Sequence, residues 1–252
     1  MALTHFRNKL NLYREKIILV FSLIILLSAT NVASAQKRIV GLNKPGYDDR
    51  PVHYGFYLAL PFTKYNIQHS QEYVNQLNTS DPMTVNAKVS PGFYTGLVLN
   101  VRLAEYLDAR FVPGVGFYGR TIEYDNVPQA TEENATELVT IPSTMVELPL
   151  LLKYKSKRRT NYRVYMVGGV KPGIDLNSRK NDRGVEGLRA EKFDLALEYG
   201  FGVDMFYPYF KFAPEIRFSH GLLNQHIADD NMYSRSLQRM TNHNVSLILY
   251  FE

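Results

Sequence analysis

Eight stretches of this chain place a large apolar side chain at every second residue, with small, polar or charged residues between them. A period of two is the spacing of a β-strand whose two faces meet different surroundings. In the first stretch Tyr54, Phe56 and Leu58 fall on one face, and Gly55 and Tyr57 on the other. No amphipathic helix pattern of useful length follows residue 35, so the chain is predicted to be all-β. The stretches are His53–Asn66, Gly92–Leu103, Asp108–Glu123, Thr140–Lys155, Tyr162–Asp175, Lys192–Phe206, Pro208–Gly221 and His243–Glu252.

The connections between these stretches alternate between short and long. The short ones are Ala104–Leu107, Ser156–Asn161 and the Tyr207-Pro208 corner, whereas the long ones are Ile67–Pro91, Tyr124–Val139, Leu176–Glu191 and Leu222–Asn242. Short turns at one end and long loops at the other are typical of outer-membrane barrels, and most stretches reach the ~9–11 residues that a spanning strand needs. We therefore predict an eight-stranded antiparallel up-and-down transmembrane β-barrel. Its even strand number would put both mature termini on the short-turn, periplasmic side.

The first 35 residues have the pattern of a secretory signal peptide. Four basic residues and one acidic residue precede the apolar run Ile17–Ala29, and Ala33-Ser34-Ala35 forms a cleavage motif. A membrane anchor is the alternative, but the run is shorter than the ~20 residues of a spanning helix. The predicted organisation is a cleaved signal peptide at 1–35, a periplasmic arm at 36–52 and an outer-membrane barrel at 53–252.

Composition narrows the possible functions. The net charge is +5, and losing residues 1–35 leaves +2, so a nucleic-acid partner has little support. The absence of Cys excludes disulfides, thiolate metal sites and a lipidated N-terminus. The barrel must then be held by its strands in the outer-membrane lipid, where Tyr and Phe would form the lipid-facing band. No cofactor or metal site is predicted.

The polar face carries charges of both signs. Arg or Lys on the lipid face would cost ~2–4 kcal/mol at the bilayer midplane, so these side chains are expected to point into the lumen and to pair there. We predict a structural charge network that fills the bore, and a conducting or gated pore remains the alternative. The network residues are Arg110, Glu147, Lys153, Lys171, Glu198, Glu215 and Arg217.

Three prolines inside the stretches conflict with a closed barrel, which has no edge strand. Pro113, Pro149 and Pro214 lack the N–H that a strand ladder uses, and they lie at comparable heights above the short turns. We expect β-bulges at these positions.

Two sets of residues could indicate nucleotide binding or catalysis, but a structural role explains each set better. Gly114–Gly119 matches G-x-G-x-x-G but no helical pattern follows it, so we interpret Gly114 and Gly116 as lumen-facing gaps beside long charged side chains. A catalytic rim would have to use residues of one loop region, and no supporting motif accompanies them. We predict that the protein is not an enzyme. The rim residues are Ser219, His220, His226, Asp229 and Asp230.

Two segments and the C-terminal stretch resemble a known family. Asn43–Phe56 looks like the opening of PorT-family proteins of Bacteroidetes, and Val146–Tyr154 resembles the fourth strand of the same outer-membrane β-barrel superfamily. Asn244–Glu252 resembles a C-terminal signal for the barrel-assembly machinery, which would be a partner during insertion, although a terminal Phe is commoner than Glu252. The resemblance implies an integral outer-membrane protein needed for type IX protein secretion, without catalytic residues.

The implied chemistry is protein binding. The arm and the basic turn would meet components of the secretion apparatus, through the residues Tyr47, Asp48, Lys157, Arg158 and Arg159. The alternatives are a small porin or surface binding barrel without a secretion role, and a rim enzyme.

Overall fold

The computed structural model describes residues 41–76, 84–127, 135–177, 188, 190–229 and 232–252. Residues 1–41 and 42–252 form separate units, and the described fold is that of the second. The predicted signal peptide, its cleavage site and residues 36–40 of the arm lie outside the described residues and stay predictions. None of the described helices is long and apolar enough to cross a membrane.

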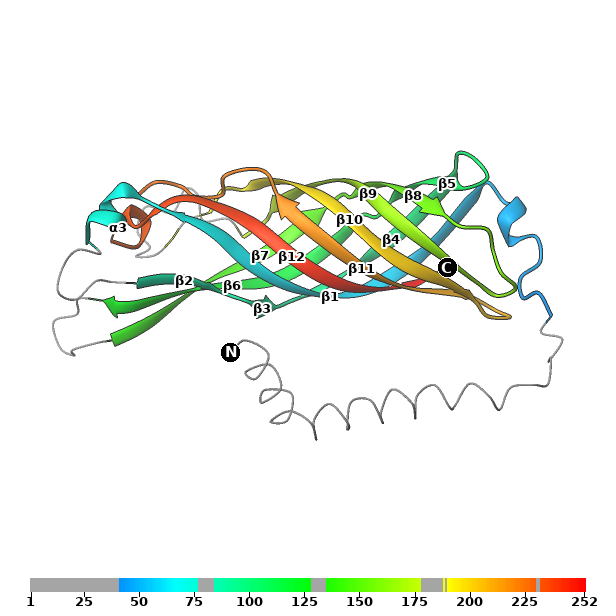
Figure 1. The fold of residues 1–252 in the computed structure, drawn as a ribbon, viewed down its shortest axis with the longest axis horizontal. Coiled ribbons are helices and arrows are strands. Elements are labelled where there is room, and N and C mark those ends of the chain that lie inside the picture. Colours follow the sequence, from blue (N-terminus) through cyan, green and yellow to red (C-terminus); the bar gives the residue numbers. More distant parts are fainter. Residues whose placement is uncertain (1–40, 77–83, 128–134, 178–187, 189, 230–231) are drawn as a thin grey trace, which may run out of the picture. The chain divides into compact units, whose positions relative to one another are not determined.

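A ring of antiparallel strands closes on itself, as the alternation predicted (Figure 1). Two short helices, α3 (Gln71–Gln76) and α4 (Met232–Arg235), and the 3-10 helix η1 (Tyr47–Asp49) accompany the strands. The strands are β1 (Val52–His69), β2 (Thr84–Lys88), β3 (Ser90–Pro91), β4 (Phe93–Arg102), β5 (Leu107–Phe111), β6 (Gly114–Val127), β7 (Ala135–Glu147), β8 (Leu150–Lys155), β9 (Tyr162–Asp175), β10 (Phe193–Phe206), β11 (Lys211–Gly221) and β12 (Leu237–Phe251).

The ring order is β1-β4-β5-β8-β9-β10-β11-β12, and β12 pairs with β1 to close it. The third predicted stretch is β5 followed by β6, and the fourth is β7 followed by β8. Farther from the short turns, the wall runs β4-β6-β7-β9 instead. Closure satisfies the backbone groups of both end strands, which lipid could not.

Strands extend farther into the predicted long loops than expected. β2 pairs with β6, β3 pairs with β1, and β12 begins at Leu237 instead of His243. The predicted long connections Ile67–Pro91 and Leu222–Asn242 therefore contain strand residues that the sequence did not predict. Period-2 alternation is weak there because the strands extend past the apolar band, where both faces are polar or mixed.

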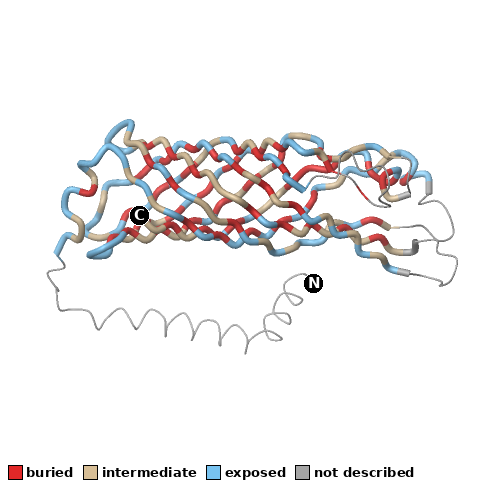
Figure 2. Tube along the Cα trace, turned by 180° about the vertical axis from the view of Figure 1, so that it is seen from behind, coloured by how far each residue is buried: buried red, intermediate tan, exposed pale blue. Residues whose placement is uncertain are grey.

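The two faces of the wall match the predicted alternation (Figure 2). Along β1 the outward Tyr54, Phe56 and Leu58 are exposed, whereas the inward Tyr57 and Ala59 are buried. β8 and β10 alternate in the same way. Exposed apolar side chains on the outside of a closed ring need lipid around them, since water would penalise so large a surface.

The prolines do not produce the expected bulges. Gly96 lies opposite Gly114 and Leu99 lies opposite Phe111, so each strand has two residues between these pairs and the register is unbroken across Pro113. The register is equally continuous across Pro149 between β5–β8 and β6–β7. Pro214 is paired with Leu249 in the regular register of β11 and β12. The bulge prediction was wrong.

The proline carbonyls still accept hydrogen bonds from the neighbouring strand, and a side chain replaces one of the N–H donors that proline lacks. Leu97 N–H donates to the Pro113 carbonyl at 2.9 Å and Val112 N–H to the Pro149 carbonyl at 3.0 Å. Val112 would in turn accept from residue 149, which has no N–H because it is proline. The Tyr94 hydroxyl donates to the Val112 carbonyl at 3.3 Å and takes that place.

Two buried apolar clusters lie at different heights. One lies in the lumen and contains Tyr57, Tyr94, Tyr165 and Tyr250. The other joins strand residues such as Tyr65 and Ile122 to connecting segments, and α3 contributes Tyr73. The long-connection end of the barrel therefore has apolar packing alone in this cluster, whereas the lumen combines an apolar cluster with buried ion pairs.

We expect Tyr94→Phe to lower the free energy of unfolding by about 1 kcal/mol, because it leaves the Val112 carbonyl without a donor. In a Pro149→Ala background the new N–H can reach that carbonyl, so the same substitution should then have a smaller effect. Denaturant unfolding in micelles of the wild type, the two single variants and the double variant measures the effect of Tyr94→Phe in each background. Tyr54→Phe, on the lipid face, is the matched control, and equal losses in both backgrounds would contradict the assignment.

Candidate functional site: the ion-paired lumen and its mouth

The predicted network residues all lie inside the ring. Each occupies an inward position of its strand, and the parity of the strand alone puts it there. Each of these residues exposes 6% or less of its surface to solvent. In such a position a charge must be paired and hydrogen-bonded to be tolerated.

A chain of ion pairs crosses the middle of the lumen. Arg110 Nη1 lies 2.8 Å from Glu215 Oε2, and Arg217 contacts the other oxygen of Glu215. Arg217 also reaches Glu198 at 3.2 Å. Glu215 therefore holds two guanidinium groups, and removing its charge would leave both short of a counter-ion.

The same chain continues through Lys171. Its Nζ lies 3.3 Å from Glu198 and 3.1 Å from Glu147. Tyr118 donates at 3.0 Å to the same oxygen of Glu147 that Lys171 binds. Six of the seven predicted network residues thus form one connected path across five strands of the wall, β5, β7, β9, β10 and β11.

Tyrosine rings separate and flank the cations. The Arg110 guanidinium lies 4.6 Å from the Tyr250 ring, and Lys153 Nζ lies 3.7 Å from the Tyr165 ring. Cations attract the faces of such rings, more strongly where water is excluded. The rings also fill volume that paired charges alone would leave open.

The glycines of the G-x-G-x-x-G motif make room for tyrosines. A Cβ added at Gly114 would lie 1.9 Å from the Tyr57 hydroxyl, and one at Gly116 would lie 2.6 Å from the Tyr118 ring. The expected lumen gaps are present, but aromatic rings occupy them instead of the long charged side chains we expected.

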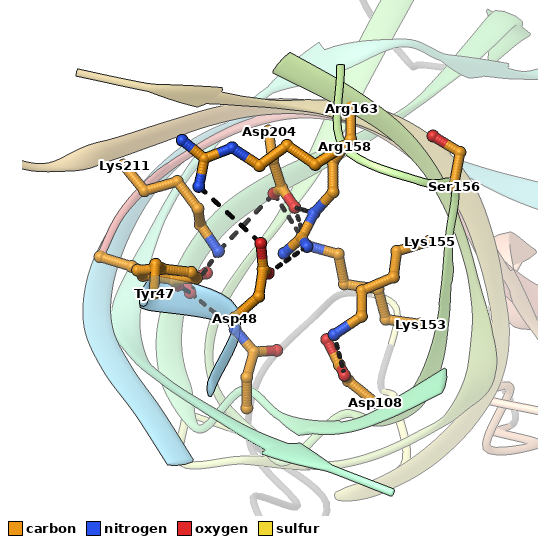
Figure 3. A network of polar contacts seen from close by, with 12 residues as sticks. Tyr47, Asp48, Asp108, Lys153, Lys155, Ser156, Arg158, Arg163, Asp204 and Lys211 are labelled. Carbon is orange, nitrogen blue, oxygen red and sulfur yellow. Dashed lines mark hydrogen bonds and ion pairs between the residues drawn. The ribbon is translucent and has the colours of Figure 1, made fainter. Parts of the chain in front are cut away.

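The seventh network residue, Lys153, belongs to a second cluster nearer the short turns. Its Nζ lies 2.8 Å from Asp204, which also binds Arg163 at 2.7 Å and Lys211 at 3.6 Å. One carboxylate therefore faces three cations (Figure 3). Asp204 lies at an inward position of β10, but strand parity could not show that it is the centre of this cluster.

The arm supplies a further carboxylate to this cluster. Asp48 pairs with Arg163 at 2.5 Å and lies 3.8 Å from Arg158, so the arm occupies the mouth at the short-turn end (Figure 3). Asn43 accepts a hydrogen bond from Arg158 through its carbonyl, and its side chain donates to Phe206 O. Burial lowers the pKa of Arg158, and Asp48 opposes that shift.

Tyr47 anchors the arm beside the C-terminal residue. Its hydroxyl donates to Glu252 Oε2 at 2.9 Å, and its ring stacks on His53 at 3.9 Å. Burial raises the pKa of Tyr47, and the nearby carboxylates of Glu252 and Asp204 raise it further, so the hydroxyl keeps its proton. Tyr47 thus fixes the arm in the mouth of the barrel by one hydrogen bond and one ring contact.

Glu252 is the functional residue that sequence reasoning missed. It follows Tyr250 and Ile248 in the inward parity of the predicted stretch His243–Glu252, so the alternation alone could have placed it in the lumen. Its carboxylate binds Lys211, and it lies 3.6 Å from Arg110. It therefore connects the mouth cluster to the central chain.

The five predicted partner residues lie at this same mouth, in different situations. Tyr47 is buried, and Asp48 and Arg158 bind each other, whereas Lys157 and Arg159 are exposed. The arm and the basic turn are therefore one bound unit. Whether any of the five meets a partner stays a prediction.

The rim residues do not form a single constellation. Ser219 faces the lumen and its neighbour His220 faces outward, where it contacts Tyr199 and His243. His226 instead contacts Ser234 at 2.9 Å. Asp230 lies outside the described residues. No group of three or more His, Asp or Glu side chains suited to a metal occurs in the described part of the chain.

The comparisons with known proteins agree with this architecture. A family model for the outer membrane protein beta-barrel domain matches residues 34–226. The chain belongs to this family of outer-membrane barrels. An outer-membrane barrel of this kind sits in the outer-membrane lipid.

Two solved structures are similar to this outer-membrane barrel. Neisserial surface protein A is 11% identical, with a TM-score of 0.39 over 80% of this chain and 98% of the other. OprG from Pseudomonas aeruginosa is 16% identical, with a TM-score of 0.37 over 78% of this chain and 92% of the other. No curated protein sequence matches the chain.

We expect Glu215→Gln to lower the free energy of unfolding of this outer-membrane barrel by about 3 kcal/mol, because it leaves two buried guanidinium groups short of a counter-ion. Folded barrels migrate differently from unfolded ones in gels, so the denaturant midpoint is measurable without Trp. Glu72→Gln, at an exposed position of α3, is the control. A midpoint unchanged from the control would show that the chain of ion pairs is not stabilising.

We expect Asp48→Asn to loosen the arm. Chymotrypsin should then cut after Tyr47 about fivefold faster, since a partly exposed ion pair contributes about 1 kcal/mol. Asp49→Asn removes the same charge at the next, exposed residue and should leave the rate near that of wild type. Equal rates for the two variants, with equal cutting of the unfolded chains, would contradict the role of Asp48.

Proposed function

We propose that this protein is a non-enzymatic, non-conducting outer-membrane barrel that takes part in type IX protein secretion, as a component of the apparatus or of its assembly. The filled lumen is the observation that carries the non-conducting part. Arg110, Glu215, Arg217 and their partners occupy the bore, and the arm occupies the mouth. With the bore filled, the working surfaces are the two ends and the lipid-facing wall.

The secretion role is supported by the resemblance of Asn43–Phe56 to the opening of PorT-family proteins. In this structure that same segment forms the arm and the start of β1. A segment that fills the mouth needs particular side chains, such as Tyr47 and Asp48, to contact the barrel. This requirement is a physical reason for the sequence of this segment to resemble that of the family.

We place both mature termini on the periplasmic side, because short turns in outer-membrane barrels lie there. The exposed Lys157 and Arg159, with Tyr209 on the neighbouring turn, would then face the periplasm. A partner with an acidic surface fits this end best.

Deleting the gene should abolish export of type IX cargo, and the wild-type gene should restore it. The double variant Lys157→Gln, Arg159→Gln should restore export less well, because it removes two exposed charges from the proposed contact. Cargo in the culture medium, measured by immunoblot, is the readout. Lys64→Gln with Lys192→Gln removes the same charge near the long-connection end and serves as control.

Normal export from the deletion strain would remove the secretion role. A small porin is the alternative, because a polar lumen is also what porins have. Planar-bilayer recording distinguishes the two: a bore filled by ion pairs should give no steady current, whereas a stable unit conductance would favour the porin.

A further inference from the structure

A pocket of about 320 Å³ lies between the arm and the barrel rim, outside the ion-paired lumen. The arm provides one side of it, and the first residues of β1 with the C-terminal residue provide the other. The residues that carry the argument below are Lys44, Arg50, Val52, His53, Tyr54 and Glu252.

Basic side chains outnumber acidic side chains in the lining of this pocket. Lys44 and Arg50 both line it, and Glu252 is the only acidic residue among its lining residues. The Glu252 carboxylate is turned away, since it binds Tyr47 at 2.9 Å, Asn100 at 2.9 Å and Lys211. Lys44 Nζ donates to the Glu252 main-chain oxygen at 3.3 Å and lies 5.3 Å from the centre of the Tyr47 ring.

Lys44 has unfavourable electrostatic surroundings. Burial lowers its pKa, and the neighbouring charge of Lys211 lowers it further against the opposing effect of Glu252, with Arg50 adding to the lowering. Its backbone has a positive φ of 48°, which is uncommon for a non-glycine residue. A bound anion would relieve the repulsion between these cations.

The pocket also adjoins the lipid-facing surface. Tyr54 is 81% exposed and Val52 is 44% exposed, and Phe56 and Leu58 follow on the same outward face of β1. Tyrosines occur at the level of lipid headgroups because one end of the ring is apolar and the other is polar. A molecule in this pocket would therefore have its anionic part beside Lys44 and Arg50 and an apolar part over Phe56.

We propose that this pocket binds the phosphate headgroup of an anionic glycerophospholipid, with an acyl chain lying along the outward face of β1. Lys44 and Arg50 bind the phosphate by charge and hydrogen bonds. His53 and Tyr54 border the headgroup. Bound lipid would hold the arm against the rim and so favour the closed mouth.

The test is native mass spectrometry of the full mature chain released from nanodiscs that contain equal phosphatidylglycerol and phosphatidylethanolamine. Wild-type protein should retain phosphatidylglycerol, and Lys44→Gln with Arg50→Gln should retain at least about tenfold less, since each Lys or Arg near a membrane surface contributes about 1 kcal/mol to anionic lipid binding. Heat-modifiable gel migration checks that the variant is folded, and Arg50→Gln alone is the milder variant, with a smaller loss expected.

Lys64→Gln with Lys192→Gln removes the same charge from exposed positions near the long-connection end and should retain lipid as wild type does. An equal loss in this control, or equal retention of phosphatidylethanolamine, would overturn the proposal because the attraction would not be local. Displacement by inorganic phosphate alone would also overturn it, since the acyl contact would then contribute nothing. The result does not depend on cargo export, so either proposal can fail without the other.

Discussion

Each charge that points into this lumen needs a partner of opposite sign, because the bore offers too little water to solvate it. Glu215 meets this need for two arginines, and Asp204 for Lys153, Arg163 and Lys211. The Arg110–Glu215 pair joins β5 to β11, and the Lys153–Asp204 pair joins β8 to β10, so each connects strands that are not neighbours in the ring. The other pairs lie within β11 or between neighbouring strands. The barrel is therefore stabilised by the backbone ladder around its wall and by ion pairs across its centre.

The wall itself depends on an unbroken ladder. Proline removes a donor at positions where a closed ring has no edge, and this chain keeps the register and uses a lumen side chain to replace a lost bond. Tyr94 does so for the Val112 carbonyl opposite Pro149. The lumen residues thus have two tasks: they pair with one another, and they satisfy the wall. The arm extends the same principle to the mouth, where Asp48 and Tyr47 bind Arg163 and Glu252.

The alternation along each strand predicted which side chains face inward, and Tyr57, Glu147 and Lys171 are examples. It did not predict which of them pair, because pairing across a bore depends on strand tilt and on the height of each residue. Lys153 was predicted only as one member of the lumen network, and the structure shows that it binds Asp204 nearer the mouth. The arm was expected to be available to partners, whereas Tyr47 is buried in the mouth.

The sequence by itself determined the approximate positions of the eight predicted stretches, the lipid-facing and lumen-facing sets and the closed antiparallel ring, because a period of two and the alternation of short and long connections are local properties. Only the tertiary structure decided that Glu252 links two charge clusters, that the arm fills the mouth and that the prolines keep register. These features depend on distances between residues that lie far apart along the chain, and a periodic pattern does not contain such distances.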